Sequence, residues 1–202
     1  VVPEFGNEQF PGSSKYNLAN MSKSSKEFNK PDSWHFGIIE ELFSATKEKL
    51  NLTFPKYNIY GHSAGAQFVH RFVMFGSSPN LDLAISANAG WYTFPNTTID
   101  FPYGIKGLDN AQQFTKRAFA KKMTILLGDE DTDPNHKYLR KAKEAMAQGK
   151  HRFSRGNTFF QYAQTLAKTR GFPFAWKVQI AKGVDHSNTG MAKHAAELLG
   201  KN

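Results

Sequence analysis

The chain has 202 residues, of which 40% are hydrophobic and none is cysteine. This length suits one domain with a substantial core, and the lack of cysteine excludes a disulfide framework, a thiol nucleophile and zinc sites built on thiolates. The net charge is +9, but Lys and Arg are spread over the whole length without a stacking motif or a recognition helix, so no nucleic-acid partner is expected. No apolar run is long enough to span a membrane.

The first quarter of the chain predicts one strand, one long loop and one helix. Residues 1–5 are expected to form a short buried strand, and residues 6–31, rich in Gly, Pro, Ser, Asn and Lys, a long surface loop. Pro31-Asp32-Ser33 provides a helix start, and apolar residues at helical spacing carry the helix to near Leu50. Aromatic and β-branched residues over 56–60 then predict a strand.

The most informative segment follows that strand directly. Gly61-His62-Ser63-Ala64-Gly65 matches G-x-S-x-G, and apolar residues at helical spacing continue it over 66–73. In this motif a serine sits on a sharp turn between a strand and a helix, with its hydroxyl exposed. The strained turn brings the residues on either side of the serine into near contact, which only glycine tolerates. Ser63 is therefore the candidate nucleophile.

Strands and helices alternate over the rest of the chain. The predicted strands are 81–88, 123–127 and 177–181, and the predicted helices are 137–148, 157–169 and 190–199. Such alternation indicates an α/β fold with a mainly parallel sheet flanked by helices. Ligands of such sheets bind outside the carboxyl ends of the strands. The functional site is expected at that edge.

Residues 91–122 interrupt the alternation with an aromatic-rich excursion, interpreted as a lid-like insertion. Trp91 and Tyr92 are candidates for substrate binding because they directly follow the carboxyl end of a strand. The alternative is that these rings only form the core of the insertion. His62, the variable residue of the serine motif, is expected to point away from the serine hydroxyl, and it is also assigned to substrate binding.

A serine hydroxyl becomes a good nucleophile when a base takes its proton and a third group orients that base. His186 is the candidate base because, of seven histidines, it alone lies in a loop directly after a predicted final strand. The acid is expected among Asp129, Asp131 and Asp133, in the loop after the preceding strand. Asp131 is favoured because Gly128 ends the strand and leaves a few residues for the turn, with Asp129 next.

The Asp-x-Asp-x-Asp spacing also resembles a calcium loop. The sixth position is Pro134 where such a loop needs glycine, and the twelfth is Arg140 where it needs glutamate. No metal and no cofactor are therefore expected.

The serine motif, the strand-Gly-x-x-Asp loop and the late Gly-x-x-His loop resemble the α/β-hydrolase superfamily of serine esterases. Within it, the chain is most similar to bacterial esterases of the polyester-depolymerase type. The resemblance covers nearly the whole chain, although only the serine motif is specific. It implies an α/β-hydrolase fold, a Ser63–His186–Asp131 triad and an acyl-enzyme mechanism.

The oxyanion hole needs two donors, of which the backbone N–H of Ala64, after the nucleophile, is expected to be one. The second normally comes from an earlier loop of the His-Gly-Gly type, and no such motif precedes Ser63. By the family's register, residues 1–5 would be its fourth strand, so residues 1–202 are expected to be a single catalytic domain that lacks its first strands. The alternative is a compact variant in which Phe5-Gly6-Asn7 supplies the second donor.

These observations predict a carboxylic-ester hydrolase acting on a small-molecule or polymeric ester. The same groups would also cleave amides or peptides. A catalytically inactive hydrolase fold used for binding is the alternative from another class of protein, and an absent oxyanion donor would favour it. Neither the compartment nor the oligomeric state follows from the sequence.

Overall fold

The computed structural model describes residues 1–200, and its centre is a four-stranded parallel sheet in the order β3-β4-β5-β6. The strands are β3 (Tyr57–His62), β4 (Leu81–Ala87), β5 (Lys122–Gly128) and β6 (Trp176–Ala181). Because all four run the same way, their carboxyl ends meet at one edge, as the sequence predicts.

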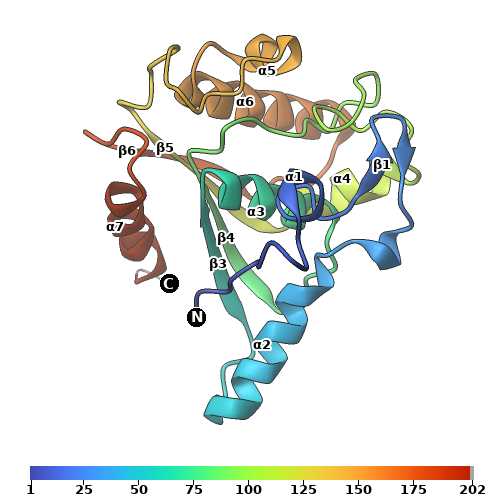
Figure 1. Ribbon diagram of the computed structural model, residues 1–202, viewed down its shortest axis with the longest axis vertical. Coiled ribbons are helices and arrows are strands. Elements are labelled where there is room, and N and C mark those ends of the chain that lie inside the picture. The colour runs from blue at the N-terminus through green and yellow to red at the C-terminus, as the bar shows by residue number, and fades with distance from the viewer. Residues whose placement is uncertain (201–202) are drawn as a thin grey trace.

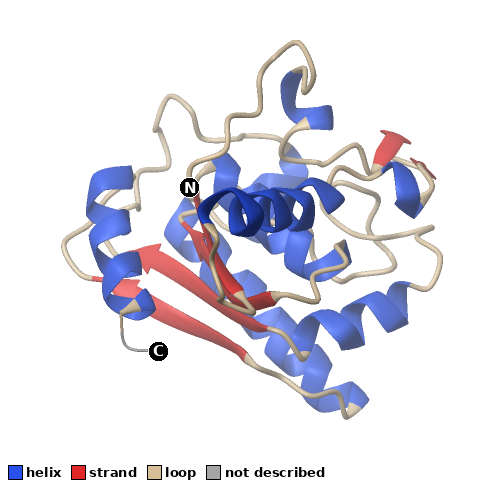
Figure 2. Ribbon diagram, turned by 90° about the horizontal axis from the view of Figure 1, so that it is seen from below, coloured by secondary structure: helices blue, strands red, loops and turns tan. Residues whose placement is uncertain are grey.

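Helices cover both faces of this sheet (Figure 1). Helix α3 (Ala64–Phe75) packs on β3 and β4, and α6 (Arg152–Arg170) packs on β5 and β6. Helix α7 (Asn188–Leu199) lies on the opposite side of the strands, as a view at right angles also shows (Figure 2). The expected α/β class with a flanked parallel sheet is therefore confirmed.

The side-chain alternation of β5 shows how one strand serves both faces. Ile125 and Leu127 belong to the large apolar cluster under α3 and α6, whereas Leu126 belongs to the smaller cluster under α7. All three are fully buried. Successive strand residues point to opposite faces, so a strand covered on both sides reads as a continuous apolar run.

The remaining elements surround this sheet. They are α1 (Gly12–Lys15), β1 (Ser22–Ser24), β2 (Glu27–Phe28), the 3₁₀ helix η1 (Pro31–Ser33), α2 (Gly37–Leu50), α4 (Ala111–Phe119) and α5 (Lys143–Gln148). Strands β1 and β2 form a small antiparallel pair of their own. The expected loop over 6–31 therefore contains short elements. Among residues 1–200, no helix combines the length and the hydropathy needed to cross a bilayer.

The predicted strand over residues 1–5 is wrong. These residues pair with no strand in the described part of the chain, and the side chains of Val1 and Val2 are 85% and 95% exposed. The ring of Phe5 is held instead by aromatic contacts with Tyr16 and Phe68, 5.0 and 5.4 Å away. The apolar residues at the start of the chain therefore do not form a strand, and the segment packs on the rest of the protein through the ring of Phe5.

Three helix starts also differ from prediction. The helix expected to start at Pro31-Asp32-Ser33 begins at Gly37, after those three residues form the separate 3₁₀ helix η1. The helix expected from residue 137 begins only at Lys143, and in the segment before it the carbonyl of Arg140 accepts from Arg155 Nη2 at 2.8 Å. Helix α6 begins at Arg152, five residues earlier than expected. The His151 side chain caps it by accepting from the backbone N–H of Ser154.

Candidate active site

The serine motif forms the expected turn between β3 and α3. Ser63 adopts φ 54° and ψ −111°, a conformation unfavourable for a residue with a Cβ, and its N–H donates to the carbonyl of Ala87. A Cβ added to Gly61 would collide with the carbonyl of Gly65. The turn thus requires glycine on structural grounds, and it leaves the serine side chain at the carboxyl edge of the sheet.

Three side chains from three separate loops meet at this edge. The Ser63 hydroxyl lies 3.0 Å from His186 Nε2, and His186 Nδ1 lies 2.7 Å from Asp131 Oδ2. His186 follows β6 and Asp131 follows β5. Asp131 is 4% exposed and the His186 side chain 15%. The arrangement lets the carboxylate accept from Nδ1–H while Nε2 accepts from the serine hydroxyl.

The other two aspartates of the same loop lie elsewhere. Asp129 accepts from the backbone N–H of Gly183 and pairs with Lys182 at 3.3 Å. Asp133 accepts from the backbone N–H of Asn135 and is exposed. Of the three carboxylates left open by the sequence, Asp131 is the one that contacts His186.

Arg152, at the start of α6, is a member of the site that the sequence did not indicate. Its Nη1 donates to Asp131 Oδ1 at 3.1 Å, and the side chain is only 2% exposed. Burial alone would raise the pKa of Asp131, but the hydrogen bond from His186 and the charges of His186 and Arg152 lower it below its usual range. The carboxylate is thereby kept ionised while it is buried.

His136 is a second residue that the sequence did not single out. Its Nδ1 accepts from Arg152 Nη2 at 3.1 Å, and its ring centroid lies 5.5 Å from that of His186. Burial and the charge of Arg152 lower its pKa, so the neutral ring is the form that accepts this bond. No local pattern around His136 distinguishes it, since Arg152, which ties it to the site, lies 16 residues later in the chain.

His62 packs against the base and does not line the cavity at Ser63. Its ring centroid is 4.7 Å from that of His186, and its Nε2 is buried without a hydrogen-bond partner in the described residues. Burial, followed by the charge of His186, lowers the pKa of His62 to about 4. The structure thus places His62 against the ring of His186 and outside the lining of the cavity at Ser63, contrary to the expected role in substrate binding.

A cavity of about 740 Å³ opens at the serine. Ser63, Ala64 and Trp91 line it, so Trp91 lies where a substrate-binding residue is expected. Tyr92 does not line it: its ring is fully buried and stacks on Phe159 at 4.5 Å. Tyr92 is thus a core residue, which corrects the expectation for its side chain.

Much of the excursion over residues 91–122 is likewise core. Phe94, Phe101 and Ile105 belong to the large apolar cluster, and Arg71 lies 4.3 Å above the Trp91 ring. The Ala64 N–H opens α3, so it has no acceptor within the helix and is free to serve an oxyanion. None of Phe5, Gly6 and Asn7, the expected alternative source of the second donor, lines the cavity.

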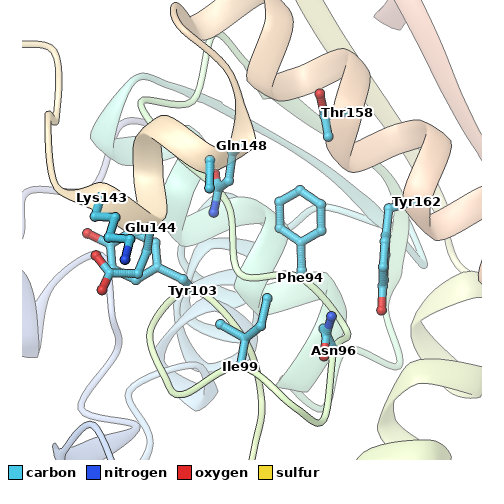
Figure 3. A pocket seen from close by; sticks show the side chains of 10 residues that line it. Phe94, Asn96, Ile99, Tyr103, Lys143, Glu144, Gln148, Thr158 and Tyr162 are labelled. Atoms are coloured by element: carbon cyan, nitrogen blue, oxygen red, sulfur yellow. The ribbon is translucent and has the colours of Figure 1, made fainter.

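A second cavity, of about 430 Å³, lies between α5, α6 and the 94–103 loop (Figure 3). Phe94, Ile99 and Tyr162 line it, and none of the three triad candidates does. Tyr103 borders it, and the Tyr103 hydroxyl accepts from Arg140 Nε at 3.0 Å. Because Arg140 lines the cavity at Ser63, the Tyr103–Arg140 pair separates the two cavities.

A parallel sheet, a strained serine after β3 and a histidine–aspartate pair at the same edge define an α/β-hydrolase. Poly(aspartic acid) hydrolase-1 from Sphingomonas sp. KT-1 has a similar structure, with a TM-score of 0.91 and 41% identity over 97% of this chain and 74% of that chain. LpqC, a poly(3-hydroxybutyrate) depolymerase from Bordetella parapertussis, matches with a TM-score of 0.89 and 30% identity over 98% of this chain and 67% of that chain.

No protein-family model and no curated protein matches the sequence. The two structural relatives nevertheless show the family. The chain belongs to the α/β-hydrolase family that includes these two polymer hydrolases, in agreement with the resemblance to polyester-depolymerase-like esterases.

Proposed function

We propose that this protein is a serine hydrolase that cleaves carboxylic esters, including the ester bonds of polymers, through an acyl-enzyme. The observation that carries the proposal is the position of His186, whose two ring nitrogens lie 3.0 Å from Ser63 Oγ and 2.7 Å from Asp131 Oδ2. A base within hydrogen-bond reach of both a hydroxyl and an orienting carboxylate is what nucleophilic catalysis by serine needs.

In the proposed reaction, Ser63 Oγ attacks the ester carbonyl while its proton passes to His186 Nε2. Asp131 holds the ring orientation and stabilises the cation that forms. The tetrahedral intermediate collapses as His186 returns the proton to the leaving alcohol, which leaves the acyl group on Ser63. A water, deprotonated by His186, then attacks the acyl-enzyme, and a second collapse releases the acid and restores the serine.

Labelling with a fluorophosphonate tests this proposal. The probe should attach covalently to Ser63 of the intact chain, and Ser63→Ala should abolish both labelling and ester turnover. Ser187→Ala is a matched control, because Ser187 caps α7 and is not in contact with His186 through its hydroxyl. An intact chain that leaves the probe unreacted would support the alternative of an inactive, ligand-binding hydrolase fold.

One observation favours a second candidate, hydrolysis of amide bonds in a polyanion. Lys137, Arg140, Lys141 and Arg152 line the cavity at Ser63, and none of its lining residues is acidic. Arg71, Arg152 and Arg155 are fully buried, and Asp131 is the one carboxylate among the buried residues of the described chain. Arg155 Nη1 donates to the carbonyl of Gly90 at 2.6 Å, so two cations lie directly behind the cavity wall at Gly90 and Trp91.

Such a cavity would attract a chain that carries repeated carboxylates. One of the two structural relatives is a poly(aspartic acid) hydrolase, and poly(aspartic acid) combines carboxylates with backbone amides. The triad chemistry is the same for an amide, with an amine as leaving group. The two candidates therefore differ in the substrate that the cavity accepts.

Salt distinguishes these candidates. If the substrate is a polyanion, kcat/KM on poly(aspartic acid) should fall by about tenfold or more between about 0.01 and 1 M salt, where the Debye length falls from about 30 to about 3 Å. Turnover of a neutral ester should change far less. Lys137→Gln with Lys141→Gln should lower only the polyanion rate, whereas Lys122→Gln, at the amino end of β5, serves as control. Equal salt responses for both substrates would remove the polyanion candidate.

A further inference from the structure

The cavity at Ser63 contains a tyrosine whose hydroxyl is without a partner. Tyr16 follows α1 and lines the cavity together with Ser63 and Ala64. Within residues 1–200, no group hydrogen-bonds its hydroxyl, although the neighbouring Asn17 is paired with Gln67 at 2.8 Å. A half-buried phenol without a partner at a reaction site is available to a ligand.

The position of this hydroxyl is defined by the first turn of α3. A Cβ built on Gly65 would lie 3.5 Å from Tyr16 Oη. The phenol oxygen therefore lies against the start of α3, where the N–H of Ala64 has no acceptor within the helix. An oxyanion formed on a carbonyl attached to Ser63 develops at this same helix start.

The Tyr16 ring is held in place by its surroundings. It contacts Phe5 at 5.0 Å between centroids and stacks on Phe68 at 6.1 Å with an interplanar angle of 17°. Its backbone is fixed as well, because the Tyr16 N–H donates to Gly12 and its carbonyl accepts from Ala19. Burial raises the pKa of Tyr16, so the phenol keeps the proton that a donor needs.

We propose that the Tyr16 hydroxyl is the side-chain donor of the oxyanion hole and acts together with the backbone N–H of Ala64. The inference rests on the proposed hydrolase function and adds a catalytic residue to it. When Ser63 attacks, the carbonyl oxygen gains negative charge between these two donors. A preorganised donor of this kind lowers the barrier because it need not reorient as the charge forms.

The test is Tyr16→Phe, which removes one oxygen and leaves the packed ring. We expect kcat for a short neutral ester to fall by about 10²–10³-fold, with KM changed only a few-fold, because the lost bond forms mainly in the transition state. Rates are expressed per active site titrated with a fluorophosphonate, so unfolded protein does not enter them. Tyr162→Phe, at a half-buried tyrosine that lines the second cavity and not the cavity at Ser63, should leave kcat unchanged.

A boronic acid that adds to Ser63 provides the second measurement. Its tetrahedral adduct carries the oxygen that Tyr16 would contact, so Tyr16→Phe should weaken binding by a factor similar to the loss in kcat. A Tyr16→Phe variant with wild-type kcat and wild-type boronate affinity overturns the assignment of Tyr16. An intact wild-type chain that does not react at Ser63 overturns the proposed function itself, so the two failures are distinct.

Discussion

Asp131→Asn should lower kcat for ester hydrolysis by about 10⁴-fold in the protein that remains folded. The change also leaves Arg152 buried without its carboxylate partner, so the variant should be less stable than the wild type. An asparagine keeps the shape of the side chain but no longer stabilises a positive charge on His186. Its amide is also able to donate to Nδ1, which favours the tautomer with the proton on Nε2, where the serine proton has to go. The measurement is steady-state turnover of a chromogenic ester, normalised to the folded fraction determined by circular dichroism.

Asp129→Asn is the matched control for this prediction. Asp129 lies two residues away in the same loop but contacts Gly183 and Lys182, so its loss should change kcat little. If instead Asp129→Asn is the damaging change and Asp131→Asn is nearly silent, the third member of the triad has been misassigned.

Arg152→Met should lower the free energy of unfolding by about 3–5 kcal/mol at neutral pH. The Arg152 and Asp131 side chains are only 2% and 4% exposed. The variant therefore leaves the Asp131 carboxylate buried, with His186 as its remaining side-chain partner. Removing one member of a buried ion pair costs more than the pair contributes, since an uncompensated charge stays in the interior. Denaturant unfolding followed by circular dichroism measures the difference.

Acid provides an internal check on that explanation. Contacts with His186 and Arg152 lower the pKa of Asp131 in the folded protein, so the stability they contribute is present above the unfolded pKa, about 3.9. It is lost as the pH falls through the lower folded value. The deficit of Arg152→Met should therefore shrink as the pH falls below about 4.

An exposed ion pair gives the comparison. Lys122 and Asp82 lie 2.8 Å apart, but the Lys122 side chain is 62% exposed, so Lys122→Met should cost at most about 1 kcal/mol. A deficit for Arg152→Met no larger than that of Lys122→Met, or one that persists unchanged in acid, would contradict the role given to the buried pair.

The sequence by itself determined the features that depend on neighbouring residues. The G-x-S-x-G turn is local, because a Cβ on Gly61, two positions before Ser63, would collide with the carbonyl of Gly65, two positions after it. The alternation of strands and helices follows from periodicity, and it placed the loops of Ser63 and His186 at one edge of a parallel sheet. These inferences succeeded because their physical causes lie within a few residues of one another.

Only the tertiary structure decided the features that depend on distant residues. The choice between Asp131 and Asp129 as the acid of the triad depends on which carboxylate contacts His186, and His186 lies 55 residues after Asp131 in the chain. Arg152 and Tyr16 carry no local signal, and they come to the site because α6 packs on β5 and the segment after α1 packs on α3. The same reason explains the strand that did not form. Residues 1–5 have the apolar residues of a strand, but a strand forms only beside a partner, and the described chain offers none.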